Sequence, residues 1–380
     1  MRIVVAMDSF KGSLSSPEAG NAVRKGILKA DPTAVVDVLP LADGGEGTVD
    51  ALISCMGGEK VKVTVTGPLG EPVLSEYGIL PGGRTAVIEM CSAAGLPLVP
   101  ENRRDPRYTT TYGVGEMIRD AIGRGCDRFM IGIGGSATND GGVGMLQALG
   151  FEFRNAEGSE IPRGAAGLKD LTQIRREKML PKLTECTFRI ACDVTNPLCG
   201  PTGCSAVYGP QKGATKDMIP EMDRSLRAYA ELAKQSFPEA DADYPGAGAA
   251  GGMGFAFRTF LHADLTPGVK IVTEETHLEA YIRQADLVIT GEGRLDGQTA
   301  SGKAPVGVAR IAKMYGKPVI AFAGSVAEDA EVLHTGGIDA FFPIVRGALT
   351  PEEAMEPERA KKNLAAAAEE AIRLLAVRQE

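Results

Sequence analysis

Tryptophan is absent from this 380-residue sequence, and histidine occurs only three times, at positions 262, 277 and 334. A mechanism built on a histidine base is therefore disfavoured, because histidine is the side chain most often used for proton transfer. No apolar run approaches the ~20 residues of a membrane span, and the amino terminus turns polar too early for a signal peptide. We expect a cytoplasmic protein without a membrane partner.

The seven cysteines form no CxxC pair, and the closely spaced Cys192, Cys199 and Cys204 have no histidine near them in the sequence. Reduced thiols are therefore expected, and a zinc site is not. Asp and Glu outnumber Lys and Arg by 49 to 41, and the basic residues form no cluster. Because phosphate backbones are bound by clustered basic residues, nucleic acid is not expected as a partner. The sequence is compatible with both a monomer and a homodimer.

Glycine is the abundant residue, with 48 occurrences where average usage would give roughly 27. Many glycines follow short apolar runs, which lie at 3–7, 35–39, 129–133, 188–191, 287–290 and 319–323. Segments with helical spacing lie between several of these runs, at 17–30, 46–56, 113–123 and 301–315. Strand, loop and helix in alternation predict an α/β fold with a largely parallel sheet, whose ligands bind at the carboxyl ends of the strands.

Residues 59–90 break this alternation, because three strand-like segments are separated only by the short turns 67–70 and 81–83. Turns this short predict an antiparallel meander. We place the opening of an inserted α/β domain here, at 59–284, within a first domain made of 1–58 and 285–380. The alanine-rich segment from Pro351 onward is predicted to form a helix that covers the first domain.

Two nucleotide-binding motifs match only in part. Residues 297–303 fit GxxxxGK, but Ala304 stands where a Mg²⁺-ligating Ser or Thr belongs, so a helix N-terminus that binds an anion beside Lys303 is the alternative. Residues 132–137 fit GxGxxA, with Glu152 at the spacing of a ribose-binding acid. Two further glycines delay the helix that this fingerprint should open. An NAD-dependent oxidoreductase and a non-catalytic metabolite-binding protein both remain alternatives to a kinase.

The loops at the predicted strand ends combine carboxylates, lysines and arginines with glycine. Glycine lets backbone amides approach an anion, carboxylates can hold hydrated Mg²⁺, and basic side chains neutralise phosphate. Asp and Gly are also common turn residues, so one such loop would carry little weight. Five of them together favour phosphoryl transfer, where catalysis is mostly positioning and electrostatics.

The same loops, in this order, resemble those of the bacterial type I glycerate kinases, a family unrelated to P-loop kinases. The matching segments are 8–16, 40–48, 131–142, 191–203, 208–214, 245–255 and 290–305. The resemblance implies a Rossmann- or flavodoxin-like parallel-sheet domain formed by both chain ends, an inserted mixed α/β domain, and an active site in the cleft. It also implies ATP as co-substrate, Mg²⁺ as cofactor and D-glycerate as acceptor. For the branch with these loops it suggests 2-phosphoglycerate as product, with 3-phosphoglycerate as the alternative.

Residue roles are hypotheses on top of this resemblance. Asp193 and Asp43 are candidates for general base or Mg²⁺ ligand, and Arg294 and Lys11 for contacts with the phosphoryl group or the substrate carboxylate. The candidates for substrate binding are Ser9, Glu46, Asn196 and Asp296. The candidates for the nucleotide are Gly134, Gly135, Ser136, Thr138, Asn139, Lys212 and Lys303. For each of them, a buried and hydrogen-bonded loop anchor is the competing interpretation.

Overall fold

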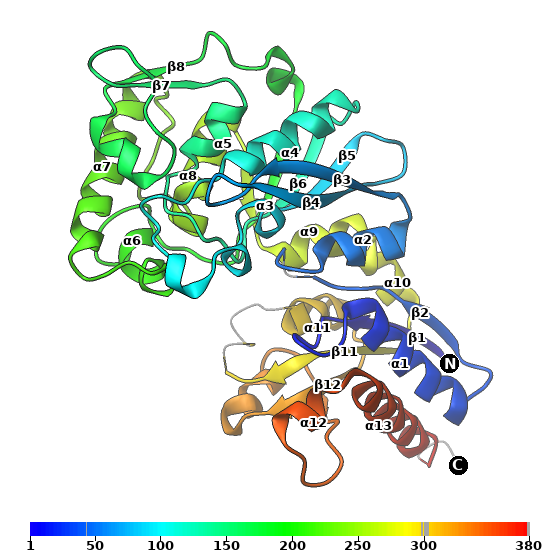
Figure 1. Cartoon of the computed structure of the whole chain (residues 1–380). Coiled ribbons are helices and arrows are strands. Elements are labelled where there is room, and N and C mark those ends of the chain that lie inside the picture. The colour runs from blue at the N-terminus through cyan, green and yellow to red at the C-terminus, as the bar shows by residue number, and fades with distance from the viewer. Residues whose placement is uncertain (43, 298, 300–303, 378–380) are drawn as a thin grey trace. The chain divides into compact units, whose positions relative to one another are not determined.

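The computed structural model describes residues 1–42, 44–297, 299 and 304–377. By contact, the chain divides into two compact units. Unit 1 comprises Met1–Asp43, Asp50–Met56 and Val269–Glu380, and unit 2 comprises Gly44–Val49 and Gly57–Gly268. The domain borders expected at residues 58 and 285 stay a prediction, because grouping by contact does not show which segments fold independently. The two units are described separately below (Figure 1).

Unit 1 contains a five-stranded, wholly parallel sheet in the order β13-β12-β11-β1-β2. Its strands are β1 (Arg2–Met7), β2 (Val35–Val38), β11 (Leu287–Leu295), β12 (Val319–Val326) and β13 (Ala340–Pro343). In chain order this is the 2-1-3-4-5 arrangement of flavodoxin-like folds, in which the strand order reverses between β1 and β11. The predicted parallel-sheet domain built from both chain ends is confirmed, and its ligand position is expected at that reversal.

Helices cover both faces of this sheet. On one face, α1 (Ser16–Ala30) packs with α13 (Pro357–Val377), as Figure 1 shows, and on the other lie α10 (Leu278–Gln284) and α11 (Ala304–Met314). The start of α1 is fixed by a capping box, in which Ser15 and Glu18 each bond the backbone of the other. Gly26 allows the close approach of α1 and α13, because a Cβ there would overlap the carbonyl oxygen of Ala365. The predicted carboxyl-terminal helix thus lies on unit 1, preceded by the short α12 (Pro351–Met355).

Unit 2 contains a mixed six-stranded sheet in the order β10-β9-β6-β5-β4-β3. Its strands are β3 (Glu59–Thr66), β4 (Pro72–Ile79), β5 (Thr85–Glu89), β6 (Arg128–Gly132), β9 (Thr187–Ala191) and β10 (Asp264–Thr266). Strands β3, β4 and β5 form the predicted antiparallel meander, whereas β5, β6, β9 and β10 are parallel neighbours. The carboxyl ends of four strands therefore meet at one edge of this sheet. A separate antiparallel pair is formed by β7 (Glu152–Arg154) and β8 (Gln173–Arg175).

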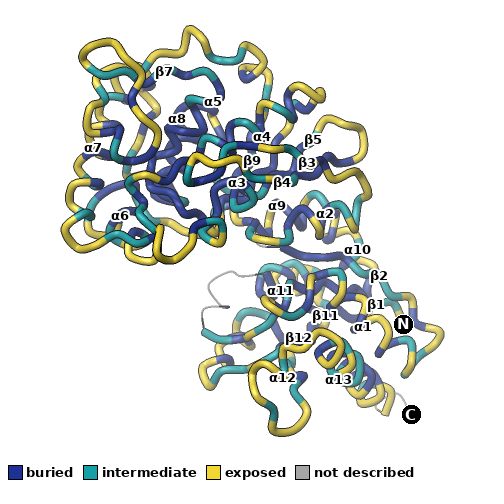
Figure 2. The backbone as a smooth tube through the Cα atoms, viewed as in Figure 1, coloured by how far each residue is buried: buried dark blue, intermediate teal, exposed yellow. Residues whose placement is uncertain are grey.

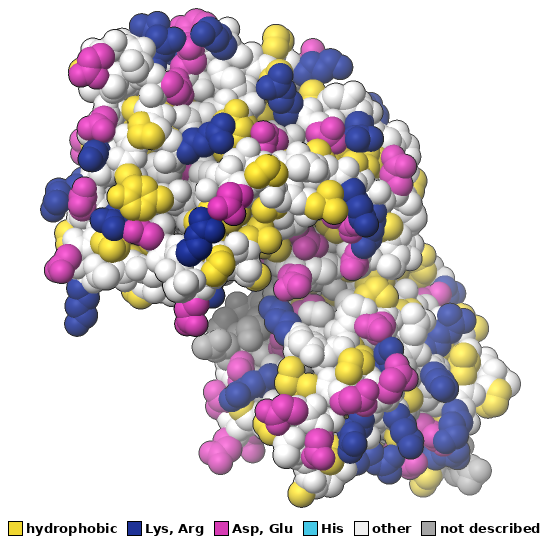
Figure 3. Space-filling view, viewed as in Figure 1, with side chains coloured by type: hydrophobic (Ala, Val, Ile, Leu, Met, Phe, Trp, Pro, Cys, Tyr) yellow, Lys and Arg dark blue, Asp and Glu magenta, His cyan; other side chains and the backbone are white. Residues whose placement is uncertain are grey.

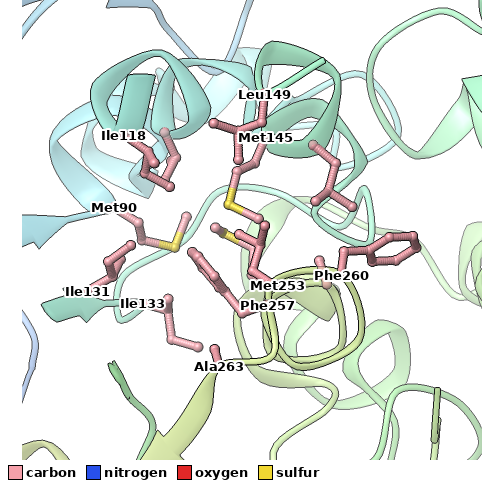
Figure 4. Packing of buried hydrophobic residues seen from close by; sticks show 14 of the residues in the cluster. Met90, Ile118, Ile131, Ile133, Met145, Leu149, Met253, Phe257, Phe260 and Ala263 are labelled. Carbon is pink, nitrogen blue, oxygen red and sulfur yellow. The ribbon is translucent and has the colours of Figure 1, made fainter. Parts of the chain in front are cut away.

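The core of unit 2 lies between this sheet and the helices packed on it. Figure 4 shows Met90 and Ile131, from the ends of the sheet strands, facing Met145, Met253 and Phe257 from the helices. The longer helices of the unit are α4 (Tyr112–Gly123), α7 (Met218–Ser236) and α8 (Ala249–Leu261). The shorter elements are α3 (Cys91–Ala94), α5 (Val143–Ala148), α6 (Cys204–Tyr208), η3 (Ala165–Asp170), η4 (Pro181–Glu185) and η5 (Pro210–Lys212). Figure 2 shows the central sheet strands buried, whereas edge strands such as β3 and the connecting loops and outer helix faces are partly exposed.

Most of α2 (Thr48–Met56) belongs to unit 1, which also contains α9 (Gly268–Glu275) from Val269 onward and η7 (Glu328–His334). No described helix is both long enough and apolar enough to cross a membrane. On the face drawn in Figure 3, basic side chains are interspersed with acidic ones on each unit instead of forming a stripe. The expectation that nucleic acid is not a partner stays a prediction.

Candidate active site

The reversal of strand order in unit 1 brings two carboxylates together. Met7 at the end of β1 pairs with Gly291 of β11, and the next residue, Asp8, donates its backbone N–H to the Gly291 carbonyl at 2.8 Å. Asp8 therefore lies beside Glu292, and both are more than nine-tenths buried. Side chains alternate along a strand, so both carboxylates extend toward the sheet face that packs against α10 and α11. The sequence analysis named both loops but assigned neither residue to the site, because only the pairing of β1 with β11 makes them neighbours.

The rest of β11 places Arg294 and Asp296 just beyond this carboxylate pair. Arg294 is exposed, and its Nε lies 3.6 Å from Asp296 Oδ2, a loose ion pair that leaves the guanidinium able to meet a ligand. The Thr299 hydroxyl donates to Glu292 Oε1 at 2.7 Å, and the Thr299 backbone N–H donates to Asp296 Oδ1 at 3.2 Å. Thr299 thus orients both the Glu292 carboxylate, which lies within β11, and the Asp296 carboxylate, which directly follows β11.

A tight loop after β1 carries Ser9 and Lys11. Phe10 and Leu14 form an isolated β-bridge, and Gly12 between them has a φ of 78°, in the left-handed region that favours glycine. The Ser9 backbone N–H donates to Asp8 Oδ1 at 2.7 Å, whereas Lys11 is exposed at the tip. The loop therefore anchors the Asp8 carboxylate from its own backbone and presents Lys11 outward.

The carboxylates of unit 1 fit a magnesium ion of the kind that kinases use. Mg²⁺ takes one or two protein carboxylates and completes its shell with water and substrate phosphates. Asp8 and Glu292, adjacent at the strand edge, supply that number of hard oxygen ligands. In the described part of the chain, no three Asp, Glu, His or Cys side chains gather into a fuller metal site. An ion bound here would therefore depend on a substrate for its remaining ligands.

In unit 2, the loop after β6 contains most of the predicted nucleotide residues. Gly134 and Gly135 are exposed, whereas Ser136, Thr138 and Asn139 are buried. Asn139 Nδ2 donates to Ser205 Oγ at 2.9 Å. Among the described residues, neither Thr138 Oγ1 nor Asn139 Oδ1 has a hydrogen-bond partner, although both atoms are buried. Buried oxygens without a protein partner are uncommon in native proteins, and bonds to a ligand or to water are a usual explanation for them.

Lys212 reaches this loop from η5. Its side chain is only 2% exposed, and Nζ donates to Ser136 Oγ at 2.7 Å and to the Thr138 carbonyl at 2.6 Å. Burial lowers the pKa of Lys212 from 10.5 to about 8, partly opposed by the negative potential of Cys204 and Asp140. The sequence analysis predicts that Lys212 contacts a phosphate. In the structure its ammonium group points into the loop and contacts Ser136 and Thr138.

Asp140, which the sequence analysis did not assign to the site, organises the base of the same loop. Its carboxylate accepts the Thr111 backbone N–H and hydroxyl, each at 2.9 Å, and the backbone N–H groups of Gly142 at 3.1 Å and Gly144 at 3.3 Å. Complete burial raises the pKa of Asp140, and these four donors oppose that rise. The carboxylate joins the starts of α4 and α5 to the end of β6.

The remaining predicted residues of unit 2 lie near the neighbouring strand ends. Asp193 is exposed after β9, and its Oδ1 accepts the backbone N–H of Gly268, the first residue of α9, at 3.1 Å. Asn196 is a loop anchor, because Nδ2 donates to the Thr202 carbonyl at 2.9 Å and Oδ1 accepts from the Tyr208 hydroxyl at 2.6 Å. Glu46 is exposed on the segment that crosses the ends of β6 and β9.

That crossing segment requires glycine. A Cβ at Gly44 would overlap the side chain of Ala191 in β9, and a Cβ at Gly132 in β6 would overlap the carbonyl oxygen of Gly44. The predicted Asp43 and Lys303 lie outside the described residues, as does most of the GxxxxGK match. Their assignments therefore stay predictions.

The dinucleotide interpretation of residues 132–137 does not fit the structure. The helix that should open directly after the glycines begins only at Val143. Glu152, at the spacing of a ribose-binding acid, lies on β7 and pairs with Arg154 at 2.6 Å and Lys178 at 2.9 Å. An acid already held by two cations in the separate β7-β8 pair is not a ribose ligand for this loop.

The cysteines and histidines are not expected to take part in the chemistry. All seven thiols are unpaired, and burial raises the pKa of each, so none is activated as a thiolate. His334 ends η7, and its Nδ1 lies 2.9 Å from the Ile338 carbonyl oxygen. That neither residue type carries the reaction stays a prediction.

The strand ends of unit 1 hold buried carboxylates and an exposed arginine. Those of unit 2 hold a glycine-containing loop with a buried lysine. These are the kinds of group that a phosphoryl-transfer enzyme uses. Comparison with known proteins specifies this further. The family model described as "Glycerate kinase family" matches residues 3–376. This chain belongs to the glycerate kinase family.

Named relatives match over almost their full length. The chain is 49% identical over 371 residues to the glycerate 2-kinase of Escherichia coli (strain K12) and 48% identical to the glycerate kinase of Bacillus subtilis (strain 168). Each match covers 96% of this chain and 97% of the relative. A crystal structure of a protein provisionally named glycerate kinase 2, from Salmonella typhimurium LT2, superposes with a TM-score of 0.92 at 48% identity. That match covers 100% of this chain and 99% of the other.

Proposed function

We propose that this protein transfers the terminal phosphoryl group of ATP to the 2-hydroxyl group of D-glycerate, giving 2-phosphoglycerate and ADP. The observation that carries the proposal is the 49% identity with a glycerate 2-kinase across nearly the whole of both chains. The two strand-edge clusters support it, because they supply the anion-binding backbone, cations and carboxylates that phosphoryl transfer needs.

In unit 1, we assign Asp8 and Glu292 to Mg²⁺, which when bound would neutralise charge on the ATP phosphates. Arg294 and Lys11 are exposed at the same edge and would contact the transferring phosphoryl group or the carboxylate of glycerate. Asp296 would orient Arg294 through their loose ion pair. These roles require only positioning and electrostatic stabilisation, without a covalent intermediate on the protein.

In unit 2, Asp193 is the candidate general base, since it is exposed at a strand end and its carboxylate is oriented by a backbone N–H donor from Gly268. A base must meet the hydroxyl proton of the acceptor directly, and an exposed carboxylate can do so. The loop of Gly134, Gly135 and Ser136 offers backbone N–H groups and a hydroxyl to an anionic part of either substrate. Glu46 is a candidate for the glycerate hydroxyls.

The test is ³¹P NMR of the purified protein with ATP, Mg²⁺ and D-glycerate. A new phosphomonoester signal split by one proton would identify 2-phosphoglycerate, because the 2-position carries a single hydrogen. Splitting by two protons would retain the kinase and reverse the position of transfer. Absence of ATP consumption by the folded protein would refute the proposal.

Two variants test the residue roles. Asp193→Asn and Arg294→Ala should each lower kcat by about two orders of magnitude or more while leaving thermal unfolding nearly unchanged, because both side chains are exposed. Turnover equal to the wild type in either variant would remove that residue from the mechanism.

A further inference from the structure

The buried ammonium group of Lys212 has no counter-charge in contact with it. Its two hydrogen-bond acceptors, Ser136 Oγ and the Thr138 carbonyl, are both neutral, and within the described residues no carboxylate comes within ion-pair distance of it. Asp140 contributes negative potential, but its oxygens are held by donors from Thr111, Gly142 and Gly144. A buried and unpaired charge is expensive to keep, which suggests that an anion compensates it in the working enzyme.

The hydrogen bond between Lys212 and Ser136 determines what the serine can do. A hydroxyl group has one hydrogen, and an ammonium group can only donate, so Ser136 accepts from Lys212 and its own hydrogen points elsewhere. A hydroxyl that accepts a charge-assisted bond becomes a stronger donor, because consecutive hydrogen bonds polarise one another. Ser136 is thereby prepared to donate to an acceptor of negative charge.

The surroundings of Ser136 leave room for such an acceptor. Gly134 and Gly135 directly precede it, are exposed, and carry no side chain that would keep a ligand from the backbone. Gly135 has a φ of 74°, a conformation that other residues rarely adopt. Thr138 Oγ1 is a second buried hydroxyl group of the same loop, and it has no hydrogen-bond partner within the described part of the chain.

We propose that Lys212 is a positioning residue that acts through Ser136, fixing the serine hydroxyl and the 134–136 backbone as a binding site for an oxyanion of a substrate. The oxyanion is either the carboxylate of glycerate or a phosphate of the nucleotide, since both present the same charged oxygens. The inference rests on the proposed function for the identity of these two substrates. It differs from direct contact between lysine and phosphate, because the lysine would not touch the ligand.

The test is a double-mutant cycle of Lys212→Met, Ser136→Ala and their combination, with Lys216→Met as the control for loss of an exposed lysine nearby. Steady-state kcat and both KM values would be measured from about pH 7 to about pH 9.5, which spans the titration of the buried lysine. Each single variant should lower kcat/KM for the same substrate by about 10- to 100-fold, the effect of losing a charge-assisted hydrogen bond. The double variant should be no worse than the more damaged single variant, because the two residues act in series.

The pH profile separates this role from a merely structural one. Wild-type kcat/KM should fall as the pH rises through about 8, where the buried lysine loses its proton, and Lys212→Met should lack that fall. The titratable groups that face Lys212 are the Asp140 carboxyl and the Cys204 thiol, whose pKa burial raises to about 11, and Arg104 packs its backbone over Gly213. These groups stay in place in Lys212→Met, so the difference between the two profiles reports the lysine. Lys216→Met should follow the wild type.

The substrate whose KM changes identifies the source of the oxyanion. A rise in the KM of glycerate alone indicates its carboxylate, a rise in the KM of ATP alone indicates the nucleotide phosphates, and a fall in kcat alone indicates the transferring phosphoryl group. Losses that multiply in the double variant, or wild-type kinetics in folded Lys212→Met, would overturn the inference. If Lys212→Met does not fold, Ser136→Ala, which removes a single oxygen atom, still tests the inference through its own kinetics.

Binding measurements distinguish failure of this inference from failure of the proposed function. Calorimetric titration with D-glycerate, and separately with the magnesium complex of the non-hydrolysable ATP analogue AMP-PNP, needs no turnover. If the wild type binds one probe and Lys212→Met and Ser136→Ala both bind it about 10- to 100-fold more weakly, the oxyanion site stands even without glycerate phosphorylation. Equal affinities in all three proteins would refute it, whatever the reaction.

Discussion

Replacement of Lys212 by methionine should increase the stability of the protein at neutral pH although it impairs the site. Burial lowers the lysine pKa from 10.5 to about 8, and this difference corresponds to a cost of about 3 kcal/mol for keeping the ammonium charged in the folded state. Methionine has a similar length and no charge. The stability gained by removing the buried charge is reduced by loss of the hydrogen bonds to Ser136 and Thr138, at about 1 kcal/mol each. We expect Lys212→Met to raise the free energy of unfolding by about 1 kcal/mol at pH 7.

The pH dependence of this effect has a definite sign. Between pH values of about 8 and 10.5, the unfolded chain holds a proton on Lys212 that the folded chain has released. The contribution of Lys212 to stability therefore rises with pH in this interval, and its full cost is present below about pH 8. The advantage of Lys212→Met should be largest near pH 7, vanish as the pH rises through this interval and reverse at its upper end.

Urea unfolding of both proteins from about pH 7 to about pH 10, followed by circular dichroism, measures this difference. The seven thiols titrate in the same interval with the opposite sign, because their raised pKa values make the folded chain hold protons that the unfolded chain loses. They lower the absolute stability of both proteins and cancel in the difference. A difference that stays constant with pH, or a loss of more than about 2 kcal/mol at pH 7, would refute this account of the buried charge.

Three further predictions follow from other parts of the structure. Gly26→Ala should lower the free energy of unfolding by about 1–3 kcal/mol, because its Cβ would overlap a carbonyl oxygen of α13. This loss opposes the gain of ~1 kcal/mol that alanine brings through its higher helix propensity. Gly123→Ala is the matched control, because no described atom lies within 4 Å of its Cβ position, and it should be neutral or stabilising in urea unfolding. Ala250→Gly should raise the unfolding temperature, because a φ of 52° costs a residue with a Cβ about 1–2 kcal/mol, more than the added entropy of glycine. Asp8→Asn and Glu292→Gln should each lower kcat by about 100-fold without a lower unfolding temperature, and wild-type turnover in both would remove the carboxylate pair from the site.

Most of the fold could be predicted from local patterns. The apolar runs mark the strands, and the capping box of Ser15 and Glu18 marks the start of α1. The short turns between residues 59 and 90 determine the antiparallel meander, because such turns cannot join parallel strands. These signals depend only on residues close together in the sequence, which is why they could be read without a structure.

The site was less predictable, because its geometry depends on residues far apart in the sequence. Asp8 and Glu292 are separated by more than 280 positions and become neighbours only through the pairing of Met7 with Gly291. Lys212 lies in a glycine- and proline-rich segment, which is typical of an exposed turn, and lysine is rarely buried without a partner. No local pattern indicates that its ammonium enters the loop after β6.

Three costly features converge on that loop. In the part of the chain that the structure describes, the Lys212 ammonium is buried without a counter-charge in contact, and the Thr138 hydroxyl is buried without a hydrogen-bond partner. Ala250 begins a left-handed turn of three residues, in which Gly251 packs against Thr138 and Asn139. Each feature lowers stability, and strain of this kind persists where the surrounding structure holds it for function. An oxyanion bound at Ser136 would compensate the buried charge through the serine hydroxyl, so ligand binding and folding of this loop should be thermodynamically linked. The substrate that supplies the oxyanion should therefore raise the unfolding temperature of the wild type more than that of Lys212→Met.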